Sequence, residues 1–339
     1  MIAPFKKIWL VSLIMIVFAS FMNQACAQAL SASQKKDLVN REDSLKGFAH
    51  NIVFAIETED RFRSDSQFVK MLVRALKVKN SFYYPFDSLQ SISRLYAPDS
   101  AFRIFTWQLK KDEYTYFQRG AIQMHTADGS LKLIPLHDVS NFSKKLDDSI
   151  RTPNNWIGAI YYRIVMKTSN SGKKIYTLLG FDDYTLTSTR KWMEILTFDN
   201  EGNPVFGGPY ISFREDSVHK PTRLRFNIEY KKEASTTFNY NPEMDMIVFD
   251  DLISESDQPA LKDTYIPDGD FQGFKWQNGQ WVHVEKIFNF RLKDGDYPKD
   301  NLLRDENGNL DEQKLIQQSQ KNQIKKDSTR KKPVKKDGN

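Results

Sequence analysis

The first part of the chain, after a long apolar run, has the hydrophobic spacing of amphipathic helices. One apolar stripe with charged residues between its members consists of Leu38, Leu45, Phe48, Ile52 and Ile56. A second stripe consists of Phe68, Met71, Leu72, Ala75 and Leu76. Ser64 and Gln67 have the spacing of a capping box before it, and Asn80 is expected to end it. The pattern predicts an N-terminal pair of α-helices within residues 28–80, packed against the rest of the protein or, alternatively, against a partner.

From about residue 101 onward, apolar residues recur at every second position instead. Leu224, Phe226, Ile228 and Tyr230 alternate with polar residues, as in a strand with one solvated face. The same alternation, or a short apolar run, marks further candidate strands at 102–109, 113–124, 130–136, 160–166, 174–181, 191–198, 235–240, 244–250, 271–277 and 280–288.

Typical turn sequences separate several of these candidate strands. They include Asp128-Gly129 and Asn170-Ser171-Gly172. Because nearly all connections are too short to hold a crossover helix, we expect an antiparallel meander. The predicted fold class is therefore mainly β over residues 81–313, with the helical pair in front. Three arrangements stay open, namely a barrel, a sandwich and propeller-like blades, although no repeat of 40–50 residues is visible.

The sharpest local prediction is a hairpin at residues 276–281. Asn278-Gly279 is the preferred pair for a two-residue type I′ turn, which sets Trp276 opposite Trp281. Aromatic pairs of this kind contribute about 0.2–1 kcal/mol to a sheet. We expect the two indoles to pack the hairpin, and the alternative is a platform that stacks on a carbohydrate or peptide.

Residues 1–27 have the pattern of a cleavable signal peptide. Lys6 and Lys7 precede an apolar run over 8–22, and Ala25 and Ala27 form the A-x-A pattern of a cleavage site. We expect an exported protein, periplasmic or secreted, that begins at Gln28. Two alternatives are an uncleaved anchor and a lipoprotein anchored through Cys26. Cys26 is the single cysteine, so cleavage after Ala27 excludes disulfides, cysteine-ligated zinc and a cysteine nucleophile from the mature chain.

The net charge of +6 is unevenly distributed along the chain. Residues 314–339 carry nine Lys or Arg against two Asp, whereas residues 28–313 are mildly acidic. This disfavours nucleic acid as a partner of the folded part. We expect a basic, disordered tail that is solvated or, alternatively, makes weak contact with an anionic surface.

Familiar catalytic motifs do not occur in the sequence. None of the five histidines forms a short-range zinc pair, and phosphate-binding loops and nucleophile elbows are absent, so we expect no metal and no cofactor. The best candidates for a site are Asp182, Asp183 and Tyr184, which end a strongly apolar strand after Gly180. Consecutive residues of a strand point to opposite faces, so the two aspartates are not automatically an acid/base pair. The alternative is that they are solvated loop charges.

Two stretches of the chain carry a resemblance to a known group of proteins. One runs from Tyr176-Thr177-Leu178-Leu179-Gly180-Phe181-Asp182 through 191–198 to Pro204-Val205-Phe206-Gly207, and the other runs from Tyr265-Ile266-Pro267-Asp268-Gly269 into 273–281. With Gln28 after an A-x-A site, they resemble secreted proteins of Bacteroidota to which no activity is assigned. The resemblance covers most of residues 80–290. It implies export and β architecture, and it transfers no catalytic residue.

Together these patterns favour an exported, non-catalytic binding or cell-envelope module. Its expected partner is an envelope protein or a polysaccharide. The candidate binding residues are Asp182, Asp183, Tyr184, Trp276 and Trp281. A hydrolase acting on envelope polymers, with dispersed Asp, His or Ser residues, is one alternative, and an accessory lipoprotein is another.

Overall fold

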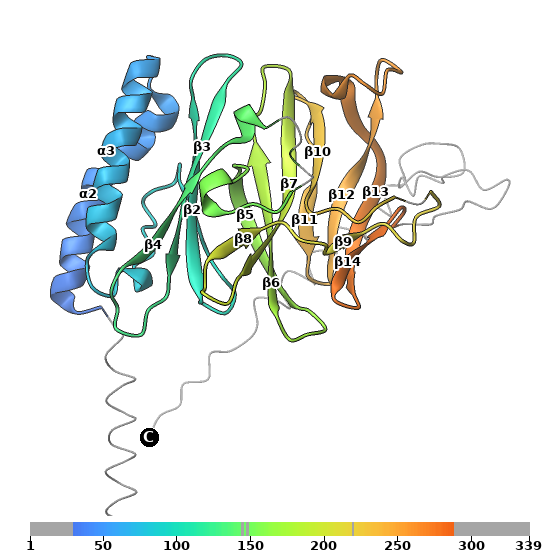
Figure 1. Cartoon of the computed structure of the whole chain (residues 1–339). Coiled ribbons are helices and arrows are strands. Elements are labelled where there is room, and N and C mark those ends of the chain that lie inside the picture. The colour runs from blue at the N-terminus through green and yellow to red at the C-terminus, as the bar shows by residue number, and fades with distance from the viewer. Residues whose placement is uncertain (1–29, 144–145, 147–148, 219, 288–339) are drawn as a thin grey trace, which may run out of the picture. The chain divides into compact units, whose positions relative to one another are not determined.

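The computed structural model describes residues 30–143, 146, 149–218 and 220–287. Two helices come first and three largely antiparallel sheets follow (Figure 1). The expected fold class, mainly β behind an N-terminal helical pair, is confirmed. The predicted signal peptide, Cys26 and the tail at 314–339 lie outside the described residues.

The helical pair consists of α2 (Ala32–Phe54) and α3 (Thr58–Leu76). Helix α2 begins with a capping box that was not predicted, in which Gln34 N donates to Ser31 Oγ and Ser31 N donates to Gln34 Oε1. Among the described residues, no helix is both long and apolar enough to cross a membrane.

The predicted boundaries of the helices need three corrections. Ser64 does not cap α3, because the helix begins six residues earlier, at Thr58, and Ser64 lies inside it. Acidic residues in the first turn stabilise this earlier start through the helix dipole. Ile56 is not part of the α2 stripe: α2 ends at Phe54, and Ile56 is 91% exposed. Asn80 is not the end of α3, which ends at Leu76, and instead adopts a left-handed conformation farther on.

The three sheets use successive parts of the chain. The first has the order β1 (Ser93–Tyr96), β2 (Phe102–Lys110), β3 (Tyr116–Met124) and β4 (Lys132–His137). The second has the order β10 (Phe226–Lys231), β7 (Ser188–Phe198), β6 (Lys174–Asp182) and β5 (Ile160–Thr168), with β8 (Pro204–Phe206) also on β7. The third has the order β11 (Phe238–Asn241), β12 (Met246–Ser254), β13 (Tyr265–Gln277), β14 (Gln280–Val284) and β9 (Ile211–Ser212).

Short helical turns occupy some of the connections between strands. They are η2 (Ser81–Tyr83), η3 (Ser140–Phe142), η4 (Pro153–Asn155) and η5 (Lys262–Thr264). Every predicted strand is present with shifted ends, whereas β1, β8 and β9 were not predicted. The parallel pairing of β9 with β14 departs from the expected meander.

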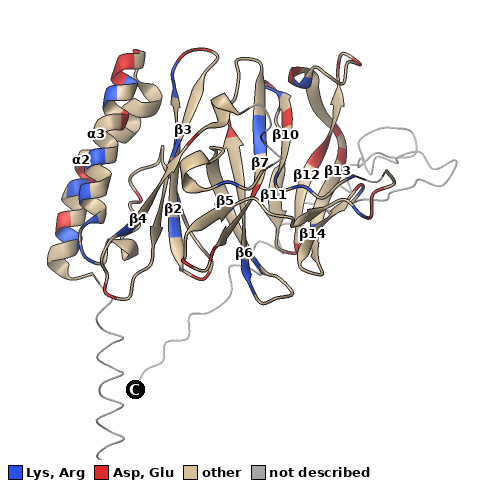
Figure 2. Cartoon of the chain, viewed as in Figure 1, with Lys and Arg blue, Asp and Glu red and all other residues tan. Residues whose placement is uncertain are grey.

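Three apolar cores separate four layers. The first core lies between the helices and the first sheet, the second between the first and second sheets, and the third between the second and third sheets. The second sheet is therefore buried on both faces, and the central part of β6 is free of charge, as Figure 2 shows. None of the sheets closes into a barrel, so the described sheets stack face to face instead.

Alternation along β6 determines which layer each side chain enters. Tyr176 and Leu178 belong to the core shared with the first sheet, whereas Ile175 and Leu179 belong to the core shared with the third sheet. Even-numbered side chains of β6 thus point toward the first sheet. This includes Asp182, the last residue of the strand.

The hairpin between β13 and β14 forms as predicted. Asn278 and Gly279 have φ angles of 50° and 78°, which a type I′ turn requires at both central positions. Trp276 pairs with Trp281, and their ring centroids lie 5.2 Å apart in an edge-to-face arrangement. The indoles therefore pack the hairpin, and Trp281 is fully buried.

Candidate functional site

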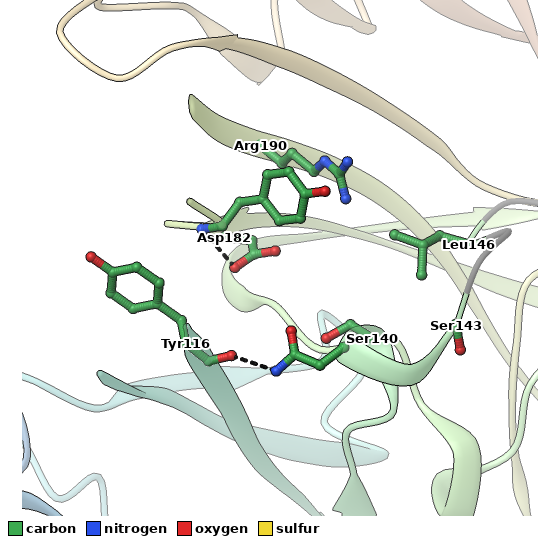
Figure 3. Close-up of a pocket in the computed structure, with 8 residues that line it drawn as sticks. Tyr116, Ser140, Ser143, Leu146, Asp182 and Arg190 are labelled. Carbon is green, nitrogen blue, oxygen red and sulfur yellow. Dashed lines mark hydrogen bonds between the residues drawn. The ribbon is translucent and has the colours of Figure 1, made fainter. Parts of the chain in front are cut away.

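A small polar cavity lies where the end of β6 meets the first sheet. Its volume is about 120 Å³. The described lining residues come from β3, from η3 and the loop after it, and from the end of β6, the following turn and the start of β7. They are Tyr116, Ser140, Asn141, Ser143, Leu146, Asp182, Tyr184 and Arg190 (Figure 3). Two of the five residues selected from the sequence, Asp182 and Tyr184, are among them.

Asp182 is the buried carboxyl group of this cavity, with 6% of its surface exposed. Its Oδ1 accepts hydrogen bonds from Gln118 Nε2 at 2.9 Å and from the Tyr184 backbone N–H at 3.1 Å. Burial raises the pKa of Asp182 to about 6, and repulsion from Asp138 adds to this, while the Tyr184 N–H, Arg190 and Gln118 act in the opposite direction. Its Oδ2 has no hydrogen-bond partner among the described residues.

The turn after β6 places an aromatic ring and a guanidinium group beside this carboxyl. Tyr184 has a φ of 51°, an unusual value for a tyrosine, and its N–H turns back to Asp182. The Arg190 guanidinium lies 3.3 Å from the centroid of the Tyr184 ring. Glu229, the cross-strand partner of Arg190, binds that guanidinium at 2.8 Å and 2.9 Å. Arg190 is thus fixed in place before any ligand arrives.

Asp183 lies one residue beyond the end of β6 and is not among the lining residues of the cavity, although its carboxylate also reaches the first sheet. Its Oδ1 lies 2.5 Å from Lys232 Nζ, and its Oδ2 accepts from Gln108 Nε2 at 3.0 Å. Lys232 also donates to the backbone carbonyl of Asp183 and to that of Thr185. Asp183 therefore holds the turn in place, and it does not share the cavity with Asp182.

Gln118 and Asp138 connect the two sheets below the cavity. The Asp138 carboxylate accepts hydrogen bonds from the backbone N–H groups of Gln118, Ser140 and Gly158. Gly158 must lack a side chain, because an added Cβ would lie 2.1 Å from Gln118 Cβ. Gln118 is itself 2% exposed, and its Oε1 has no partner among the described residues. These contacts place Gln118 against Asp182.

Tyr116 forms the wall of the cavity that belongs to the first sheet. Its backbone oxygen accepts a hydrogen bond from Asn141 Nδ2 at 3.0 Å, which Figure 3 shows as a dashed line. Burial raises the pKa of the Tyr116 phenol to about 12, and the nearby carboxylate of Asp183 adds to the shift. The phenol is therefore neutral at physiological pH and able to donate a hydrogen bond.

A buried ion pair holds the loop on the other side of the cavity. Glu194 Oε2 and Arg225 Nε are 2.8 Å apart, and the two side chains are 2% and 0% exposed. Arg225 Nη1 donates to the backbone oxygens of Leu146 and Ser149. Burial raises the pKa of Glu194 against the opposing effect of Arg225. The pair thus ties the loop that carries Leu146 to the second sheet.

The two tryptophans selected from the sequence lie at the other end of the second sheet. Asn170, in the turn before β6, donates to the backbone oxygen of Asn278 at the hairpin tip. Asp182 ends the strand that follows this turn, and it lies five residues, or roughly 17 Å along the strand, beyond Thr177. The indole N–H of Trp281 donates to Thr177 Oγ1 inside the core, so only Trp276 remains partly exposed. The structure does not bring this pair together with Asp182.

A buried histidine–aspartate pair joins β14 of the third sheet to the loop after β9. His283 Nδ1 is 2.8 Å from Asp216 Oδ1, and His283 Nε2 is 2.9 Å from Gln272 Oε1. Burial lowers the pKa of His283, against the opposing effect of Asp216. Both ring nitrogens are occupied by fixed partners within the protein. Among the described residues, no group of three or more His, Cys, Asp or Glu is arranged to hold a metal ion.

Comparison with known proteins finds no matching family model, no matching curated protein and no matching solved structure.

Proposed function

We propose that this protein is an exported, non-catalytic binding module of the cell envelope, and that the cavity around Asp182 takes a hydroxyl-bearing unit of its ligand. A sugar residue of an envelope polysaccharide is the ligand class that we favour. The observation that carries the proposal is the Asp182 carboxyl group: its Oδ1 is fixed by two N–H donors, while its Oδ2 has no partner among the described residues. The A-x-A pattern before Gln28 supports export.

The chemistry around the cavity suits a polar, uncharged group. A carboxylate oxygen accepts hydrogen bonds from hydroxyl groups, and the hydroxyls of Ser140 and Ser143 both donate and accept them. Arg190 is already neutralised by Glu229, so the cavity has little attraction for a free anion. A volume of about 120 Å³ equals that of roughly four water molecules in the liquid. It therefore suits one small unit of a larger ligand.

One observation favours a hydrolase as the second candidate. A carboxyl group whose burial raises its pKa to about 6 is protonated often enough near neutral pH to serve as a general acid. In that case Asp182 would donate its proton to the oxygen of a glycosidic bond that is being cleaved. Binding and hydrolysis place the same ligand at the same carboxyl group, and they differ only in whether the polymer is shortened.

The test is to titrate the mature protein with soluble fragments of envelope polysaccharide by calorimetry. Asp182→Asn keeps the shape of the side chain but replaces a carboxylate acceptor, so we expect binding to weaken at least ten-fold, since hydrogen bonds to charged groups contribute about 1.5–3 kcal/mol. Asp257→Asn is the matched control, because Asp257 is exposed, lies outside the cavity and has a positive φ that Asn tolerates. Equal affinities of wild type and Asp182→Asn would refute the site. Release of new reducing ends by the wild type alone would establish the hydrolase instead.

A further inference from the structure

A second, larger groove lies between α3 and the first sheet, away from the polar cavity. Its volume is about 400 Å³, within the range of roughly 300–1,000 Å³ that is usual for small-ligand sites. Val69 and Val73, one helical turn apart, form the helix side. Ala121, Leu133 and Pro135 belong to the sheet side, and the register of β3 with β4 places them on one face. The groove is therefore largely apolar.

One end of the groove carries an ion pair, Arg119 with Asp65, in which the guanidinium keeps two nitrogens free of partners among the described residues. Arg119 pairs with His137 across β3 and β4, on the same face as the apolar residues. Asp65 of α3 accepts from Arg119 Nε at 3.2 Å, and its other oxygen accepts from Trp107 Nε1 at 2.8 Å. Within the described part of the chain, Arg119 makes no other hydrogen bond. Its Nη1 and Nη2 thus remain available to a ligand, with the geometry that binds a carboxylate through two parallel hydrogen bonds.

The charged end and the apolar end are separated along both walls. From Asp65, which contacts Arg119, helix α3 rises about 12 Å to Val73. From His137, the partner of Arg119, strand β4 runs about 13 Å to Leu133. A ligand that fits this distribution has an anionic head at Arg119 and an apolar tail along the groove.

We propose that this groove binds a single-chain fatty carboxylate, with its head group on Arg119 and its acyl chain between α3 and β4. Exposed Lys70, also in the lining and without an ion pair among the described residues, adds positive charge beside the chain's path. The site is independent of the polar cavity, so the two proposals stand or fall separately.

The experiment is calorimetric titration of the intact mature protein with dodecanoate below its critical micelle concentration. We expect saturable binding at one site per chain. Decanoate should bind roughly fifteen-fold more weakly, because each buried methylene contributes about a factor of four. Val69→Asp, which places a charge on the apolar wall, and Arg119→Gln, which removes the head-group contact, should each weaken dodecanoate binding at least ten-fold.

Two controls match these variants in chemistry, and the first also matches in exposure. Val39 on α2 is 40% exposed, against 38% for Val69, and lies outside the groove, so Val39→Asp should leave the affinity within two-fold. Arg63→Gln removes an exposed cation of α3 outside the groove, and it should also leave the affinity for dodecanoate within two-fold. Thermal melts verify that each variant is folded. If Arg119→Gln does not fold, Arg119→Lys replaces it as the test of the head-group contact. No saturable binding, no dependence on chain length, or equal losses in the controls would overturn the proposal.

Discussion

The buried carboxyl group of Asp182 predicts how stability changes with pH. Its pKa is raised by burial from an ordinary value of 3.8 to about 6, so the folded protein holds the proton more tightly than the unfolded chain does. A raised pKa of this kind contributes stability that is fully present below about pH 4 and is lost as the pH rises through 6. At about 1.36 kcal/mol per pKa unit, the loss amounts to about 3 kcal/mol at pH 7.

Asp182→Asn removes this loss of stability at higher pH, because the neutral amide mimics the protonated acid. We expect the variant to match the wild type in stability at pH 4 and to exceed it by about 3 kcal/mol at pH 7, or roughly 6–12 °C in melting temperature. Urea denaturation at pH 4, 5, 6 and 7 measures the difference between the two proteins, in which the other titrating groups cancel. Asp257→Asn should show no such pH dependence. A constant difference between wild type and Asp182→Asn across this range would refute the reasoning.

Two further perturbations test the buried ion pair beside the cavity and the turn of the β13–β14 hairpin. Glu194→Gln leaves the fully buried guanidinium of Arg225 without its counter-charge and should cost about 3–5 kcal/mol in urea denaturation, whereas replacing both residues with apolar ones of similar volume should restore most of that stability. A loss below about 1 kcal/mol for Glu194→Gln would contradict this. Gly279→Ala places a Cβ at a φ of 78° and 3.1 Å from Asn170, so it should destabilise the protein by about 1–3 kcal/mol. The same change at Gly47, in a helix with open space around it, should be neutral or stabilising, and equal effects at both positions would show that the hairpin turn is not strained.

Much of the fold could be predicted because its strands show either alternating burial, as in β10, or a continuous apolar run, as in β6. Phe226, Ile228 and Tyr230 are buried while the residues between them are partly exposed, so the period of two was visible in β10. Strands β1, β8 and β9 were missed because four, three and two residues are too few to establish a period. The start of α3 was misplaced because Ser64 and Gln67 have capping-box spacing, although they lie within a helix that has already begun.

The site could be predicted only in part, since its residues meet through stacking of the sheets. The end of an apolar strand identified Asp182, but Gln118 lies 64 positions away and reaches it only because β3 and β6 belong to facing layers. The pairing of Arg190 with Glu229 could be predicted only from the register of β7 with β10, and no local signal in the sequence specifies that register. For Trp281, the sequence indicated the hairpin partner but not that the indole would be enclosed by the core.

The succession of layers along the chain has a consequence for how the protein is assembled. Helices, first sheet and most of the second sheet are each complete before the next layer begins, so each can dock on its predecessor as the chain emerges N-terminus first. Strand β9 is the exception. It begins at residue 211, shortly after β8, but it pairs with β14, which is synthesised some seventy residues later. Closing this contact is the step with the longest chain separation among the strand pairings, and such long-range steps slow folding. Until it closes, β14 is an unpaired edge of the third sheet.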